Sequence, residues 1–99
     1  MIIFADDALA DLERILAFNH SRDPASASAH IVAIRGAIQI LSDHPGIGRR
    51  LRGGSNLREL VISYGKTGYI ALYEFSPFDH VVRVVAIRHQ REAGYRGLY

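Results

Sequence analysis

Residues 81–95 read V-V-R-V-V-A-I-R-H-Q-R-E-A-G-Y, a β-branched and apolar run followed by a cluster of cationic side chains. Because β-branched side chains pack well on the pleated surface of a sheet, we predict a buried strand over 81–88. The cations of 88–91 cannot be buried together without a large desolvation cost. We therefore expect the strand to be a rigid support whose exit lies at the working surface.

Two further strands precede this one. They are L-R-E-L-V-I at 57–62 and Y-I-A-L-Y-E-F at 69–75, and short turns at 63–68 and 76–80 follow them. Turns of this length connect antiparallel neighbours, so we predict an antiparallel meander over 57–88. A sheet of this size cannot bury its apolar side alone and needs a covering layer.

The start of the chain predicts a short strand at 1–4 and then an amphipathic helix. Asp6 or Asp7 is expected to be its N-cap, since a carboxylate there accepts from unpaired backbone N–H groups, and the helix should run to about His20. The apolar spacing predicts that this helix buries Leu9, Leu12, Ile15 and Leu16 and turns Asp11, Glu13 and Arg14 outward.

A second amphipathic helix is predicted to begin at Asp23-Pro24, a cap followed by a first-turn proline, and to end before Pro45. Its expected buried positions are Ala27, Ile31, Ile34, Ala37 or Ile38, and Leu41. The short connection between the helices predicts a helical hairpin. The predicted fold class is α+β, in the order β-α-α-β-β-β, with the hairpin packed on one face of an antiparallel sheet.

The composition fits one domain over residues 1–99, with 48% hydrophobic and 22% charged residues. The absence of cysteine excludes disulfides, thiolate zinc sites and cysteine nucleophiles. The histidines show no metal-ligand spacing and the glycines no nucleotide-binding motif, so we expect neither a metal nor a cofactor. No apolar run approaches the ~20 residues that span a bilayer, and the early acids do not fit a signal peptide. We expect a cytoplasmic protein without a membrane partner.

Charge is distributed unevenly along the chain. Residues 1–43 hold three arginines against six acids, whereas 44–99 hold nine Lys and Arg against four acids. Part of this excess lies in a Gly-rich segment, 45–56, which either is a solvated loop or binds an anion. The candidate residues for binding an anion or a macromolecular target are Arg49, Arg50, Arg52, Arg88, Arg91 and Arg96.

Several stretches together resemble the RelE/ParE superfamily, the toxins of bacterial type II toxin–antitoxin modules. They are H-P-G-I-G-R-R-L, L-R-E-L-V-I, G-Y-I-A-L-Y-E-F and V-A-I-R-H-Q-R-E-A-G-Y. The resemblance implies a toxin of a plasmid-stabilisation module that a cognate antitoxin neutralises. It leaves two targets open, because RelE-like members cleave messenger RNA in the ribosome while ParE-like members poison DNA gyrase.

A metal-independent ribonuclease needs a proton carrier, an acid and cations on the phosphoryl group. The candidates are His89 for the proton, Arg58 and Arg88 for the phosphate, and Tyr95 for stacking or proton donation. The middle strands, however, supply almost no further cations. We therefore favour gyrase poisoning without catalysis, with the ribonuclease as the alternative. A non-catalytic nucleic-acid-binding module and a degenerate antitoxin-binding protein are further alternatives.

Strand direction limits how these residues can combine. The first and third strands of a meander run the same way, so the start of one and the end of the other lie at opposite ends of the sheet. Arg58 and Arg88 are then expected about 20 Å apart. One basic surface forms only if the loop 45–56 folds back across the sheet. The antitoxin is expected to contact the apolar helical hairpin and an exposed sheet edge.

Overall fold

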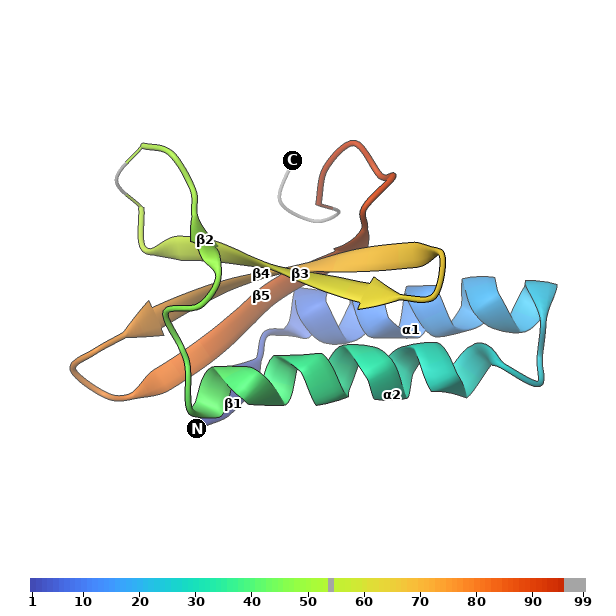
Figure 1. Ribbon diagram of the computed structural model, residues 1–99, viewed down its shortest axis with the longest axis horizontal. Helices are drawn as coiled ribbons and strands as arrows, with labels where there is room; N and C mark the ends of the chain where they lie inside the picture. The colour runs from blue at the N-terminus through green and yellow to red at the C-terminus, as the bar shows by residue number, and fades with distance from the viewer. Residues whose placement is uncertain (54, 96–99) are drawn as a thin grey trace.

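The computed structural model describes residues 1–53 and 55–95, which form a sheet with a helical hairpin on one face (Figure 1). Within these residues the helices are α1 (Asp6–Arg22) and α2 (Ala27–Ile38), followed by a 3-10 turn, η1 (Gln39–Ser42). The strands are β1 (Ile2–Phe4), β2 (Arg49–Arg50), β3 (Leu57–Tyr64), β4 (Thr67–Ser76) and β5 (Val81–His89). The predicted α+β class and helical hairpin are confirmed.

The sheet has the strand order β1-β5-β4-β3-β2. Strands β3, β4 and β5 form the predicted antiparallel meander. Strand β1 instead joins β5 in parallel, with Ile2 opposite Val82, so the whole sheet is mixed rather than antiparallel. The physical reason is that a long crossover through both helices, not a hairpin, connects the two edges. Strand β2 was not predicted, and it pairs Arg49 with Glu59.

The buried face of α1 differs from the prediction. Leu12 and Ile15 are buried as expected, but Leu9 and Leu16 remain 42% and 40% exposed. The remaining buried positions are Ala8 and Asp11. The apolar stripe is therefore rotated toward Asp11, which was expected in solvent and is 4% exposed. No helix in the described ranges is long and apolar enough to cross a membrane.

Both helix starts also differ from the predicted caps. The N-cap of α1 is Ala5, whose N–H donates to Val84 O at 2.8 Å, so the chain leaves the sheet directly into the helix. Asp6 and Asp7 lie in the first turn, where their charges still complement the helix dipole. At the second helix the predicted cap, Asp23, belongs to the turn before the helix, because its Oδ2 accepts from Ser26 Oγ at 2.9 Å. The helix α2 therefore begins three residues after Pro24.

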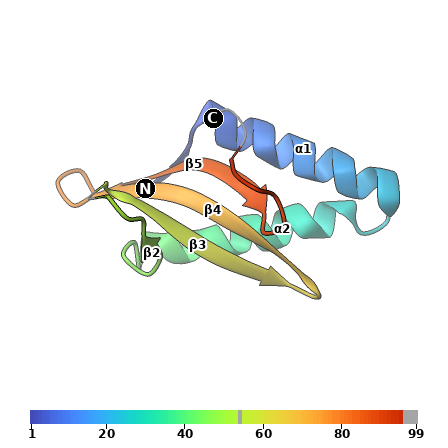
Figure 2. The ribbon, with the colours of Figure 1, turned by 90° about the horizontal axis from the view of Figure 1, so that it is seen from above.

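The main core lies between the hairpin and the sheet. Its largest fully buried side chains are Tyr73, Ile34, Ile38, Leu41, Ile87 and Val84. The opposite face, here called the open face, carries a smaller cluster of Leu72, Ala86 and Tyr95. The loop around β2 and the segment after β5 both rise on this side of the sheet (Figures 1 and 2).

A β-bulge in β5 decides where its last side chains point. Ala86 pairs with Leu72 and Val84 with Tyr73, which leaves Val85 as an extra residue. A bulge shifts the alternation of side chains by one position. Before the bulge the even-numbered residue Val84 faces the core, and after it the odd-numbered residue Ile87 does. The adjacent Arg88 and His89 consequently face opposite sides of the sheet.

Candidate functional site

On the open face, a chain of contacts links the basic loop to the end of the molecule. Arg49 Nη2 donates to Glu59 Oε1 at 3.0 Å, and Tyr95 Oη donates to Glu59 Oε2 at 2.5 Å. The guanidinium of Arg88 lies 5.1 Å from the centre of the Tyr95 ring. Glu59 thus connects two segments that the sequence analysis could not place together.

The titration of this pair follows from its surroundings. Burial favours the neutral form of Glu59, but the hydrogen bonds from Tyr95 and Arg49 outweigh it and hold the pKa of Glu59 below its ordinary value. Burial and the neighbouring carboxylate raise the pKa of Tyr95 well above its ordinary value. Glu59 is therefore a carboxylate and Tyr95 a neutral phenol at pH 7.

Arg58 anchors the loop rather than an external anion. Its Nη1 donates to Gly48 O at 2.8 Å and to Gly46 O at 3.1 Å. The Tyr73 hydroxyl holds the same loop, donating to Pro45 O at 2.7 Å and accepting from Gly48 N–H at 2.8 Å. These bonds position Arg49 at the start of β2.

Replacing Gly48 with alanine is expected to lower the free energy of unfolding by about 2 kcal/mol, because overpacking at a close contact displaces its neighbours. An added Cβ would lie 2.5 Å from Tyr73 Oη and 2.8 Å from the backbone oxygen of Glu59. Gly46→Ala is the matched control, since its Cβ would meet no atom within 4 Å. Urea unfolding of both variants checks this, and equal stability of the two would contradict the predicted clash.

Arg88 is also committed within the protein. Its Nη1 donates to the backbone oxygens of His89, Gln90 and Glu92 at 3.3, 3.4 and 2.7 Å. A guanidinium that binds three carbonyls within four residues holds the segment after β5 in a turn. The predicted phosphate clamp is thus part of the fold.

The register brings Arg58 and Arg88 closer than predicted. Arg58 pairs with Tyr73 and Arg88 with Ile70, three positions apart on β4 and two strand spacings across. Their Cα atoms lie roughly 14 Å apart by this geometry. The connection comes from the segment after β5, because Tyr95 packs over Leu72 and Ala86 and reaches Glu59, so that Arg49 is linked to Arg88 through Glu59 and Tyr95. Arg50 and Arg52 are exposed on the loop, and Arg96 lies outside the described residues.

His89 lies on the helix side of the sheet, where its ring packs edge-on to Tyr69 with centroids 5.4 Å apart. Its Nδ1 accepts from Arg91 N–H at 3.1 Å, so Nε2 carries the proton and donates to Thr67 Oγ1. Burial and the nearby Arg91 cation lower the pKa of His89 below its ordinary value. The imidazole is therefore neutral at pH 7, and both of its nitrogens are occupied.

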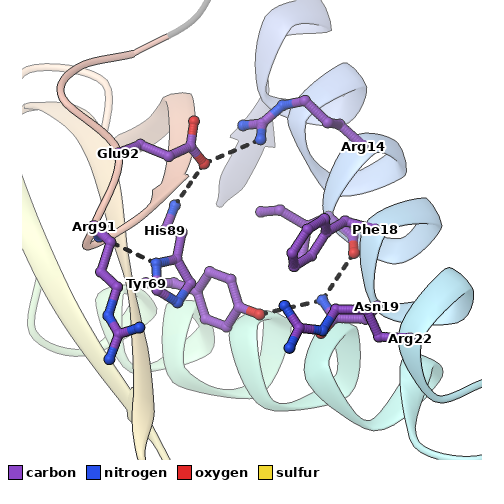
Figure 3. Close-up of a pocket in the computed structure, with 9 residues that line it drawn as sticks. Arg14, Phe18, Asn19, Arg22, Tyr69, His89, Arg91 and Glu92 are labelled. Atoms are coloured by element: carbon purple, nitrogen blue, oxygen red, sulfur yellow. Dashed lines mark hydrogen bonds and ion pairs between the residues drawn. The ribbon is translucent and has the colours of Figure 1, made fainter.

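His89 forms part of the wall of a cleft of about 440 Å³ between α1 and the end of the sheet (Figure 3). The cleft is lined by Arg14, Ile15, Phe18, Asn19, Arg22, Tyr69, His89, Arg91 and Glu92. At its floor Asn19 Nδ2 donates to Tyr69 Oη at 3.3 Å, and Tyr69 Oη lies 3.0 Å from His30 Nδ1. A phenol that accepts from Asn19 donates to His30, which makes a continuous polar network.

One wall of the cleft is tied to the sheet by a buried carboxylate. Asp11 Oδ2 accepts from Ile87 N–H at 2.8 Å, beyond the point where β1 stops pairing with β5. Arg14 bonds Asp11 Oδ1 at 3.4 Å and Glu92 Oε1 at 3.0 Å. Helix α1 thereby supplies the edge contacts that a longer β1 would have made.

The helical half of this cleft was not predicted. Helix α1 was expected only to cover the sheet, although Phe18 and Arg22 are four residues apart and therefore share one helix face. That spacing was the available signal. Among the described residues, no three His, Cys, Asp or Glu side chains are grouped so that they could hold a metal ion.

Comparison with known proteins covers nearly all of this structure. The chain matches the family model described as ParE toxin of type II toxin-antitoxin system, parDE, over residues 2–94. It is also 35% identical over 85 residues to Toxin RelE3 of Caulobacter vibrioides, which covers 86% of this chain and 88% of that relative. The chain therefore belongs to the ParE toxin family of type II toxin–antitoxin systems, within the RelE/ParE superfamily.

Proposed function

We propose that this toxin arrests growth by poisoning DNA gyrase and that it is not a nuclease. The observation that carries the proposal is the commitment of all four candidate ribonuclease side chains inside the protein. Arg58 and Arg88 bind backbone carbonyls, and Tyr95 donates to Glu59. His89 is bound through both ring nitrogens.

The chemistry of RNA cleavage does not suit this arrangement. Attack by a 2′-hydroxyl needs a free base and a proton donor on the same phosphate. His89 faces the helix side while Arg88 and Tyr95 face the open side, so the sheet separates them. The raised pKa of Tyr95 also makes its phenol a poor acid. A contact surface for a large protein or DNA target needs none of these functions.

Membership of a type II toxin family implies an antitoxin protein as partner. We propose that its tail folds onto the exposed apolar residues of α1 and the free edge of β3. Leu9, Leu16 and Phe18 are 42%, 40% and 56% exposed. Strand β2 pairs with β3 at Glu59 and Arg58, and Leu51 N–H donates to Leu57 O, so the part of that edge after Leu60 is where an added strand would pair.

Ribosome-dependent messenger cleavage is the second candidate, because the similar toxin of Caulobacter vibrioides is named RelE3. For this chain it requires the segment after β5 to open. Opening would release Arg88 from its carbonyls and Tyr95 from Glu59. A non-catalytic role in nucleic-acid binding would use the exposed loop cations Arg50 and Arg52.

The two targets are separated by adding purified toxin to a gyrase supercoiling reaction and to ribosomes translating a defined message. We expect gyrase inhibition with the message intact. His89→Ala should weaken the inhibition by less than about tenfold, whereas loss of a general base lowers a nuclease rate about 10²-fold or more. Cleavage of the message with unimpaired gyrase would overturn the proposal, and His44→Ala, at an exposed position outside the cleft and outside the candidate target-binding arginines, provides the matched control variant.

A further inference from the structure

The cleft beside His89 continues around the end of the sheet. A second hollow of about 450 Å³ adds His30, Tyr64, the β3–β4 turn at 65–66 and Thr67. The two hollows share Phe18, Asn19, Arg22, Tyr69, His89 and Arg91. They form one cleft between the hairpin connection, the β3–β4 turn and the exit of β5. Its size suits a small organic molecule.

Three cations that line this cleft, Arg22, Lys66 and Arg91, have no carboxylate or carbonyl partner among the described residues, whereas Arg14 in the same lining is paired with Asp11 and Glu92. In the described residues, Arg14, Arg49 and Arg83 bind carboxylates, and Arg58 and Arg88 bind carbonyls. Within these residues, the cations without a carboxylate or carbonyl partner are Arg22, Arg35, Arg50, Arg52, Lys66 and Arg91. Half of this set lines the cleft. The local carboxylate, Glu92, is bound by Arg14 and by His89 N–H.

The walls between these cations are flat and aromatic. Phe18 is 56% exposed, and the Arg22 guanidinium lies 5.4 Å from its ring centre. Tyr64 stacks at a tilt on His30, with centroids 4.6 Å apart. In Figure 3 the side chains of Arg22 and Arg91 lie on either side of Tyr69. A planar ring can thus pack on aromatic surfaces while its charged end reaches the cations.

We propose that this cleft binds a nucleoside monophosphate group. Arg22, Lys66 and Arg91 would hold the phosphate, and Phe18 with the tyrosine edges would pack against the base. A phosphomonoester fits better than a carboxylate, because it carries close to two negative charges at pH 7 and three acceptor oxygens. Asn19 Nδ2 is bound to Ile15 O and Tyr69 Oη, and the Tyr69 hydroxyl to His30 Nδ1, so Asn19 Oδ1 and His30 Nε2 would be the atoms of this network that hydrogen-bond a heterocycle.

This site is independent of the proposed action on gyrase. It lies on the helix side of the sheet, whereas Arg49, Glu59, Arg88 and Tyr95 lie on the open face. The ligand chemistry has two sources, a free mononucleotide or the 5′-phosphorylated end of a nucleic-acid strand. Both present the same group to the cleft.

Calorimetric titration of the full chain tests the proposal. The probes are AMP, adenosine, and a short single-stranded oligonucleotide with or without a 5′-phosphate. We expect AMP to bind and adenosine to bind at least about tenfold more weakly, since adenosine lacks the phosphate that would accept the charge-assisted hydrogen bonds. Tighter binding of the 5′-phosphorylated oligonucleotide than of AMP would identify the strand end as the ligand. The reverse order would identify the free nucleotide.

The double variant Arg22→Gln/Arg91→Gln should lose AMP binding by about tenfold or more. The matched control is Arg50→Gln/Arg52→Gln, which removes the same charge from exposed positions outside the cleft. An equal loss in both variants would reveal non-specific attraction and overturn the site, as would the absence of AMP binding up to about 1 mM. Both arginines of the test variant are exposed and form no ion pair in the described chain, so circular dichroism should report an unchanged fold.

Discussion

Replacing Asp11 with alanine is expected to lower the free energy of unfolding by about 3 kcal/mol. The carboxylate is 4% exposed and accepts the N–H of Ile87 at 2.8 Å. Its removal leaves that N–H buried without an acceptor and takes one partner from Arg14, whose buried Nε already makes no hydrogen bond in the described chain. For a domain of this size the melting temperature should fall by about 10–20 °C.

Two controls make this prediction specific. Glu13→Ala removes an exposed acid from the same helix and should change stability by less than about 0.5 kcal/mol. Asp11→Asn keeps an acceptor for Ile87 and should cost clearly less than the alanine variant. If the alanine and Glu13 variants unfold at the same denaturant concentration, the buried contact contributes no stability.

The pH dependence of Asp11 has a definite sign. Burial is the largest influence and raises the pKa of Asp11 above its ordinary value of 3.8, against the lowering effects of Ile87 N–H and Arg14. The native state therefore holds this proton more strongly than the unfolded state does. The contribution to stability declines as pH rises from that ordinary value through the raised one. In Asp11→Asn this decline should be absent.

Most of the fold could be predicted from the sequence, because the local patterns of apolar and turn residues specify its helices and strands. The apolar runs of β3, β4 and β5 and the turns between them define the meander, and the hairpin follows from helical spacing. The rotation of the buried face of α1 toward Asp11 could not be predicted, since helical periodicity assigns a charged residue such as Asp11 to the solvent-facing side. Asp11 is buried because β1 stops pairing with β5 before Ile87, and this depends on the tertiary structure and not on the local sequence.

The candidate site was harder to predict from the sequence, for one geometric reason. Strand alternation alone already separates Arg88 from His89, yet the sequence analysis grouped them as one cluster. The bulge at Val85 then decides which of them faces the helices. Without the bulge, Arg88 would point toward the core and His89 toward the open face. No local pattern in V-V-R-V-V-A-I-R-H predicts the extra residue of the bulge.

The basic loop shows a related limit. Its glycines predict irregular backbone, but they do not reveal that Gly48 is needed for close approach to Tyr73. Strand direction correctly separated the loop from the exit of β5 along the sheet, but the segment after β5 closes that separation instead of the loop. The element that completes the link, Tyr95, was considered only as a ribonuclease residue.

The contact between Glu59 and Tyr95 is expected to be the main attachment of the segment after β5 to the open face. Tyr95→Phe should lower the free energy of unfolding by about 2 kcal/mol, because it removes a hydrogen bond to a buried carboxylate. A double-mutant cycle with Glu59→Gln should give a coupling energy of about 1–2 kcal/mol. The exposed pair Arg83–Glu74, at 3.2 Å, is the control and should couple by less than about 1 kcal/mol.

Acid unfolding tests the same contact by a separate route. Because the pKa of Glu59 is held below its ordinary value of 4.5, its stabilisation is present above that pH and is lost as pH falls toward the lowered value. Glu59→Gln should therefore lose less stability than the wild type between pH 5 and the lowered pKa. Equal acid sensitivity of the two proteins, together with a coupling energy near zero, would show that Tyr95 does not hold the segment. Arg88 and its three carbonyl bonds would then be the remaining attachment.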